Sequence, residues 1–288
     1  MNLISLEPPP ARAAVSTQFV IFNLFGDYIL PRGGRIWTNQ LLRMLALLGI
    51  GERAARSTLA RMKHKGWLAT EKFGRRTQHC VTRRGRAILE QGNQRIFEPP
   101  MATWDGQWRL VVYSLPEEKR ELRNELRKKL IWYGFGNLSP GAWVSPHDRR
   151  AELEALFDEL GVSPYASVFT GRQDGRHTDQ ELVRRCWDIP ALAAAYERFV
   201  ARYQAPYEAL RAQVASGDLA ALTPEAAFVR RFWLTYDFQP FPRTDPNLPP
   251  ALLPYPWIGH TARQIFTGYR LLLSLSMGDF VDALARVA

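Results

Sequence analysis

The hydrophobic and polar positions of the first hundred residues predict three helices, a β-hairpin and a fourth helix. Apolar residues recur at helical spacing, and two short runs of β-compatible residues follow. Gly49 and Gly51 suit a tight turn between the second and third helices, and Gly74 suits the hairpin turn. The predicted elements are helices over 16–30, 38–48 and from Glu52 onward, strands over 67–72 and 77–82, and a helix over 83–97.

The third helix separates an apolar side from a basic side. Placing its residues at about 100° intervals around the axis puts Ala55, Leu59 and Met62 together. The opposite side presents Arg53, Ser57, Ala60 and His64, flanked by Arg56 and Arg61. Guanidinium groups donate to guanine in a major groove, and a small central residue lets a helix approach base edges. A merely solvated basic face is the alternative interpretation.

The hairpin adds a second basic feature directly after this helix. Arg75 and Arg76 are predicted at its tip, where they suit phosphates or a narrow minor groove. Three helices followed by a basic hairpin predict a winged helix-turn-helix that binds double-stranded DNA. The predicted DNA-binding residues are Arg53, Arg56, Ser57, Thr58, Arg61, Lys63, His64, Arg75 and Arg76.

The net charge of +10 is concentrated in this segment. Residues 1–100 hold 16 Lys and Arg against 6 Asp and Glu, whereas residues 101–288 hold 22 of each kind. Binding to phosphates releases condensed counterions, so this asymmetry favours a DNA-binding module over a basic face that only confers solubility. The two cysteines, Cys80 and Cys186, match no metal or redox spacing. With no signal peptide and no apolar run near the roughly 20 residues of a membrane span, we expect a soluble cytoplasmic protein.

The remaining two thirds predict a small α+β region followed by helices. Strands over 108–115, 142–145 and 166–170 alternate with helices over 117–133 and 149–160, which suggests a ferredoxin-like sandwich. Further helices are expected over 179–187, 191–215, 224–238 and from about Thr261, with seven prolines between 240 and 256. The predicted fold class is α+β multidomain, with a winged helix-turn-helix domain over 1–98, a ferredoxin-like domain over 99–178 and a C-terminal helical effector and dimerisation domain over 179–288.

Catalytic and metal-binding motifs are not found in the sequence. A ferredoxin-like fold also supports nucleases, but the first predicted strand of this region ends in Tyr113 and Ser114 without the carboxylate that a catalytic metal needs. Asp105 precedes that strand and is interpreted as a cap or turn residue. The five histidines lack the paired spacing of a zinc site. We therefore expect neither an enzyme nor a metal cofactor.

Several segments resemble the PaaX family of bacterial phenylacetic acid degradation repressors. The resemblance rests on seven stretches that span nearly the whole chain. They are FGDYILPRGGRIW, GERAARSTLARMKHKGWL, GRRTQHCVTRRG, LIWYGFGNLSP, LTPEAAF, DPNLPPALLP and WIGHTARQ, which lie between Phe25 and Gln264. The resemblance implies a homodimeric repressor of aromatic (phenylacetate) catabolism genes. It implies binding to a palindromic operator and release by an aryl-CoA thioester, phenylacetyl-CoA.

An acyl-CoA effector needs cations for its phosphates and an apolar site for its acyl group. The last predicted helix begins near His260, and a helix N-terminus with nearby cations suits an anion. The candidate effector residues are Arg230, Arg231, Trp233, Trp257, His260 and Arg263. Two alternatives stay open: Trp257 and His260 only pin the last helix, or the protein works through protein partners without an effector.

Overall fold

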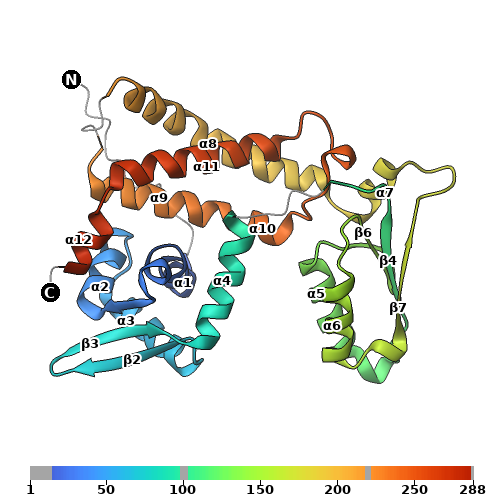
Figure 1. Ribbon diagram of the computed structural model, residues 1–288, viewed down its shortest axis with the longest axis horizontal. Coiled ribbons are helices and arrows are strands. Elements are labelled where there is room, and N and C mark those ends of the chain that lie inside the picture. Colours follow the sequence, from blue (N-terminus) through green and yellow to red (C-terminus); the bar gives the residue numbers. More distant parts are fainter. Residues whose placement is uncertain (1–14, 98–102, 218–221, 287–288) are drawn as a thin grey trace. The chain divides into compact units, whose positions relative to one another are not determined.

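The computed structural model describes residues 15–97, 103–217 and 222–286. The chain forms two compact units (Figure 1). The N-terminal unit comprises Met1–Glu98, Ala201–Gln239 and Arg263–Ala288, and the central unit comprises Pro99–Val200 and Pro240–Ala262. The residues of the predicted C-terminal domain are thus shared between both units. The predicted boundary between the first two domains, at residues 98–99, lies outside the described residues.

The N-terminal unit combines helices with a three-stranded antiparallel sheet of order β1-β3-β2 (Figure 1). Helix α4 follows the β2–β3 hairpin, and helix α9 contacts α1. The elements are α1 (Thr17–Leu24), β1 (Arg35–Trp37), α2 (Thr38–Leu47), α3 (Glu52–His64), β2 (Leu68–Phe73), β3 (Arg76–Val81), α4 (Arg83–Phe97), α9 (Pro224–Phe238) and α12 (Phe280–Arg286). Helices α8 (Ile189–Ala215) and α11 (Ile258–Met277) contribute residues to both units.

Local sequence signals account for most of these boundaries. The Ser16 hydroxyl accepts a hydrogen bond from the Phe19 amide, 3.4 Å away, and caps α1. Gly49 lies between α2 and α3 at φ 79°, and Gly74 turns the β2–β3 hairpin at φ 59°, a left-handed conformation that favours glycine. The predicted second and third helices, hairpin and fourth helix are therefore confirmed.

The first predicted helix differs from the structure in its second half. Helix α1 ends at Leu24, and the chain continues as a π-helical turn over Phe25–Ile29 and a 3₁₀ turn over Leu30–Arg32. Every residue of the π-helical turn is buried, including Asp27. The wider turn is associated with a buried carboxylate, a feature that apolar periodicity alone does not reveal.

The central unit contains a four-stranded antiparallel sheet of order β5-β6-β4-β7. The predicted strands and helices are present within one to three residues, and strand β5 is an addition. The elements are β4 (Trp108–Tyr113), α5 (Arg120–Trp132), β5 (Gly136–Ser139), β6 (Ala142–Ser145), α6 (Arg150–Leu160), β7 (Ala166–Gly171), α7 (Asp179–Cys186) and α10 (Phe241–Thr244).

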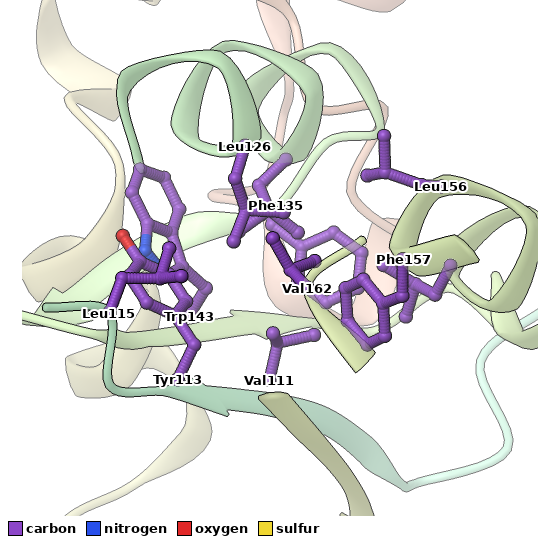
Figure 2. Close-up of a cluster of buried hydrophobic side chains, with 11 residues drawn as sticks. Val111, Tyr113, Leu115, Leu126, Phe135, Trp143, Leu156, Phe157 and Val162 are labelled. Atoms are coloured by element: carbon purple, nitrogen blue, oxygen red, sulfur yellow. The ribbon is translucent and has the colours of Figure 1, made fainter. Parts of the chain in front are cut away.

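An apolar core joins this sheet to α5 and α6 (Figure 2). Val111 projects from β4, Trp143 from β6 and Leu126 from α5, and each is at most 2% exposed. Leu156 of α6 closes the cluster on the helical side. Burying large side chains of this kind stabilises a fold by about 1.5–3 kcal/mol each.

The two edges of this sheet differ in how well they are protected. At the β5 edge the register is irregular between Asn137 and Ser139, and α7 contacts the strand. Strand β7 forms the other edge, and its residues after Ala166 are all exposed. Val168 is 37% exposed and Phe169 56%. Strand β7 also lacks the charges and prolines that usually protect an edge strand.

Candidate nucleic-acid interface

The apolar side of α3 is buried, as the sequence predicts. Ala55 and Met62 have no exposed surface, and Leu59 is 4% exposed. Helix α3 packs on α1 and α2 through this side. Because three residues at helical spacing are fixed in the core, the rotation of the helix is fixed as well, and its opposite side is directed outward.

The outward side of α3 carries the predicted basic residues. The exposed residues of α3 are Glu52, Arg53, Ala54, Arg56, Ser57, Ala60, Arg61, Lys63 and His64. Arg56 forms an ion pair with Glu52 at 2.7 Å, and the Lys63 ammonium donates to the Thr70 hydroxyl at 2.9 Å. The Lys63 contact links the C-terminal end of α3 to the first hairpin strand.

Thr58 does not lie on the outward side, which corrects its prediction as a DNA-binding residue. It is 2% exposed, and its hydroxyl accepts a hydrogen bond from the Arg61 guanidinium at 3.0 Å. Thr58 lies one residue before Leu59 on the helix, and the apolar stripe is wide enough to include it. Through this hydrogen bond, the buried Thr58 hydroxyl orients the Arg61 side chain.

The hairpin holds its two arginines differently. Arg75 is exposed at the turn, and the Arg76 guanidinium lies 4.5 Å from the centre of the Trp37 ring. Trp37 also meets Phe73 edge-on, with ring centres 5.6 Å apart, although Phe73 is 54% exposed. A cation stacked on an aromatic ring loses rotational freedom, so Arg76 is oriented in advance.

Between α3 and the hairpin the surface forms a hollow of about 830 Å³. Residues from the start of α2, the outward side of α3 and both hairpin strands line it. They are Trp37, Thr38, Asn39, Leu42, Glu52, Arg56, Leu59, Ala60, Lys63, Thr70, Arg75, Arg76, Thr77 and His79. The structure therefore brings Arg56, Lys63, Arg75 and Arg76 of the predicted set to one concave surface.

His79 lies at the base of this hollow and is 8% exposed. Burial lowers the pKa of its imidazole below the usual 6.5, and the charges of Lys63 and Arg56 lower it further. His79 is thus neutral at neutral pH. The positive charge of the hollow comes from its lysine and arginine residues.

The candidate effector residue Arg231 is part of a buried ion cluster. Its guanidinium donates to both carboxylate oxygens of Asp27, at 3.0 and 3.1 Å, and to the Ser274 hydroxyl at 2.9 Å. Arg270 donates to the same carboxylate. Arg231 is 7% exposed. These contacts correct its prediction as a ligand for phosphates, because its donors already serve the protein interior.

The other effector candidates are divided between the two units. In the N-terminal unit, Trp233 is buried, and Arg263 donates to the Ile96 carbonyl oxygen at 2.8 Å. Burial raises the pKa of Tyr269 in the same unit, and the charge of Arg230 opposes this rise. Trp257 and His260 belong to the central unit.

Trp257 is 7% exposed and meets Tyr196 edge-on, with ring centres 6.0 Å apart, while His260 is exposed. The Tyr196 hydroxyl donates to Asp245 at 2.6 Å. Trp257 therefore packs the start of α11 onto α8 within the central unit, a contact that matches the alternative of a pinning role.

The described parts of the chain hold no cluster of metal-binding side chains. Within residues 15–97, 103–217 and 222–286, no three His, Cys, Asp or Glu side chains are grouped to hold a metal ion. Asp105 accepts from the Gln107 amide and pairs with Arg109, which holds the Asp105 pKa at about 2. That is the turn role predicted for it. In the same ranges, no helix is both long and apolar enough to cross a membrane.

Two features of this surface were missed by the sequence analysis. Strand β1 brings Trp37 to the hairpin, but three residues are too few for a recognisable alternation. Glu52 was named only as the start of the third predicted helix, whereas it also lines the hollow. Its spacing of four residues from Arg56 was the available signal.

A basic helix and hairpin attached to further folded regions are typical of transcriptional regulators. The chain belongs to the PaaX family. Family models described as "PaaX-like protein", "PaaX protein central Cas2-like domain" and "PaaX-like protein C-terminal domain" match residues 16–85, 101–183 and 187–283. The transcriptional repressor PaaX of Escherichia coli K12 is 34% identical over 254 residues, covering 87% of this chain and 78% of that protein.

A solved structure supports the fold. The uncharacterized protein Rv0674 from Mycobacterium tuberculosis matches with a TM-score of 0.62 at 21% identity, over 94% of this chain and 99% of that one. The family relationship makes the chain a transcriptional regulator and not an enzyme, as the sequence predicts.

Proposed function

We propose that this protein is a DNA-binding transcriptional repressor that reads its operator with a winged helix-turn-helix. The observation that carries the proposal is the hollow between α3 and the hairpin, where four lysine and arginine side chains converge. Charge on a concave surface attracts the phosphate backbone and supplies much of the affinity for DNA. The repressor activity of the Escherichia coli relative supports the same function.

Helix α3 enters a major groove in this proposal. Arg53, Arg56, Ser57, Arg61 and His64 face outward and supply the donors for base edges and flanking phosphates. Ala60 faces the same way and leaves room for close approach. Lys63 and the hairpin arginines contact the backbone, which positions the helix without reading sequence.

We assign the central unit's sheet to the ferredoxin-like fold. The chain order β4-α5-β5-β6-α6-β7 and the spatial order β5-β6-β4-β7 support the assignment. The family description of this region as Cas2-like is in agreement. In a regulator this region serves assembly, because it lacks the carboxylate that catalysis requires at the end of β4.

Repression by a homodimer follows from the geometry of a palindromic operator, whose half-sites need two copies of α3. The β7 edge is our candidate for contact between the copies. An antiparallel pair of β7 strands satisfies the free backbone groups of both edges and buries Phe169, which is 56% exposed. Phe169→Lys then makes the protein monomeric in sedimentation experiments, whereas an unchanged mass excludes this edge.

We assign the release of the protein from DNA to an aryl-CoA thioester such as phenylacetyl-CoA. The genes that the protein regulates in this proposal are those of phenylacetate catabolism, and the protein acts in the cytoplasm. The remaining candidates for its contacts are Arg230, Trp233, Trp257, His260 and Arg263. The effector lowers the affinity for the operator by the same factor by which the operator lowers the affinity for the effector, because linkage is reciprocal. Regulation through protein partners alone is the outcome to expect if no thioester acts.

A protection assay on DNA flanking the protein's own gene tests this function. We expect a protected palindrome that disappears when phenylacetyl-CoA is added, and no effect of free coenzyme A. Protection that is insensitive to every aryl-CoA leaves DNA binding intact and refutes the effector. No protection at any protein concentration refutes operator binding itself.

A further inference from the structure

An acidic side chain stands inside the basic hollow. Glu52 is the first residue of α3, and its side chain is 63% exposed. Among the described residues that line the hollow it is the one acid, beside the basic residues Arg56, Lys63, Arg75 and Arg76. A carboxylate repels the phosphate backbone, so binding to phosphates alone does not account for its position.

One oxygen of the Glu52 carboxylate accepts hydrogen bonds within the protein, and the other is available to a ligand. Glu52 Oε1 accepts from Arg56 Nε at 2.7 Å and pairs with Arg56 Nη2 at 2.7 Å. Within residues 15–97, 103–217 and 222–286, Oε2 has no hydrogen-bond donor. The pair therefore presents an acceptor and further guanidinium donors side by side on the outward side of α3.

Helix stability explains this arrangement only in part. An exposed ion pair four residues apart and a carboxylate in the first turn each stabilise a helix only slightly. Both contributions are equally available on the sides of the helix that avoid the hollow. They do not favour this position.

The recognition of DNA bases does favour a carboxylate at position 52. The first turn of a recognition helix contacts base edges, and a glutamate accepts from the exocyclic N4 amino group of cytosine. We propose that Glu52 determines operator specificity by accepting a hydrogen bond from cytosine N4 through Oε2, while it holds Arg56 toward an adjacent guanine. The proposal rests on DNA binding by α3, as argued above.

Selection from a library of randomised duplexes tests the role of Glu52. The variants are Glu52→Ala, which removes the acceptor, and, as a matched control, Glu90→Ala in α4. Glu90 also pairs with an arginine four residues away, Arg86, but lies outside the hollow. We expect wild type and Glu90→Ala to enrich cytosine at one position of each half-site. Glu52→Ala loses about tenfold of that preference, keeps the positions outside the Glu52–Arg56 pair and binds random duplex more tightly.

A modified base tests the hydrogen bond itself. In a paired N4-methylcytosine the methyl group replaces the N–H that faces the major groove. Placing this base at the selected position weakens wild-type binding about tenfold and leaves Glu52→Ala, which has no acceptor at this position, unaffected. If the methyl group has no effect on wild type, Glu52 acts only by holding Arg56 and the proposal is wrong.

Failure of the proposed function looks different. If wild type enriches no motif and binds no duplex, DNA binding by α3 is refuted, whatever Glu52 does. If wild type enriches a motif and Glu52→Ala enriches the same one, DNA binding stands and the role of Glu52 is refuted. Equal melting temperatures for all three proteins show that folding is not the cause of a difference.

Discussion

Replacing Asp27 by alanine tests whether the buried ion cluster holds the N-terminal unit together. The Asp27 side chain is 5% exposed, and it accepts from Arg231, whose side chain is 8% exposed, and from Arg270. Asp27 lies in the π-helical turn, whereas its partners lie on α9 and α11. The substitution leaves a buried guanidinium without a counter-charge.

The expected loss follows from this burial. Removing one partner of a buried pair destabilises a protein by about 3–5 kcal/mol, whereas an exposed pair contributes about 0–1 kcal/mol. Asp282→Ala provides the control, because Asp282 also joins α12 to the N-terminal segment through Arg32 but its side chain is 39% exposed. For a unit of this size, about 2–4 °C of melting temperature corresponds to 1 kcal/mol.

Differential scanning calorimetry measures both variants on the full chain. We expect Asp27→Ala to lower the melting temperature of the N-terminal unit by about 6–20 °C, and Asp282→Ala by less than about 4 °C. The transition of the central unit stays in place. Equal small shifts in the two variants would refute the claim that the cluster is a principal link within the unit.

Three further predictions concern single side chains. Arg61→Ala weakens operator binding by about 1–3 kcal/mol and changes base preference in a mobility-shift assay; unchanged selectivity excludes a base contact. Gly85→Ala lowers the melting temperature because an added Cβ overlaps the Trp67 carbonyl oxygen, whereas Gly92→Ala in the same helix has open space and stabilises by about 0.5–1 kcal/mol; equal effects refute the contact. Asp105→Asn destabilises the central unit at pH values above 3.8, the ordinary pKa of aspartate, because the lowered pKa of Asp105 reflects stabilisation of its ionised form in the folded protein. The difference in stability between the variant and wild type disappears as the pH falls to about 2. A difference that persists at that pH excludes the ion pair as its origin.

The sequence predicts the helices and the hairpin of this surface because each of them is set locally. The period of α3 separates Ala55 and Met62 from the basic side, and Gly74 fixes the hairpin turn. Thr58 was misplaced because a list of polar residues on a helix does not define how wide the buried stripe is. Its 2% exposure depends on packing against neighbouring helices.

The missed features depend on contacts between residues distant in the chain. Asp27 and Arg231 are 204 positions apart, so neither local period nor motif spacing reveals that they pair. The effector prediction therefore treated a buried structural arginine as a free cation. Strands β1 and β5, of three and four residues, form only because β3 and β6 lie beside them.

The salt dependence of DNA binding tests most directly whether the hollow is the DNA-binding surface. Arg75→Ala/Arg76→Ala removes the hairpin pair, and Arg127→Ala/Lys128→Ala removes an equally charged exposed pair from α5. Each lost phosphate contact lowers the slope of log affinity against log salt by about 0.9. We expect the hairpin variant to lose about 1.8 per protomer and the α5 variant to match wild type. Equal slopes for wild type and the hairpin variant, or a loss confined to the α5 variant, would contradict the assignment.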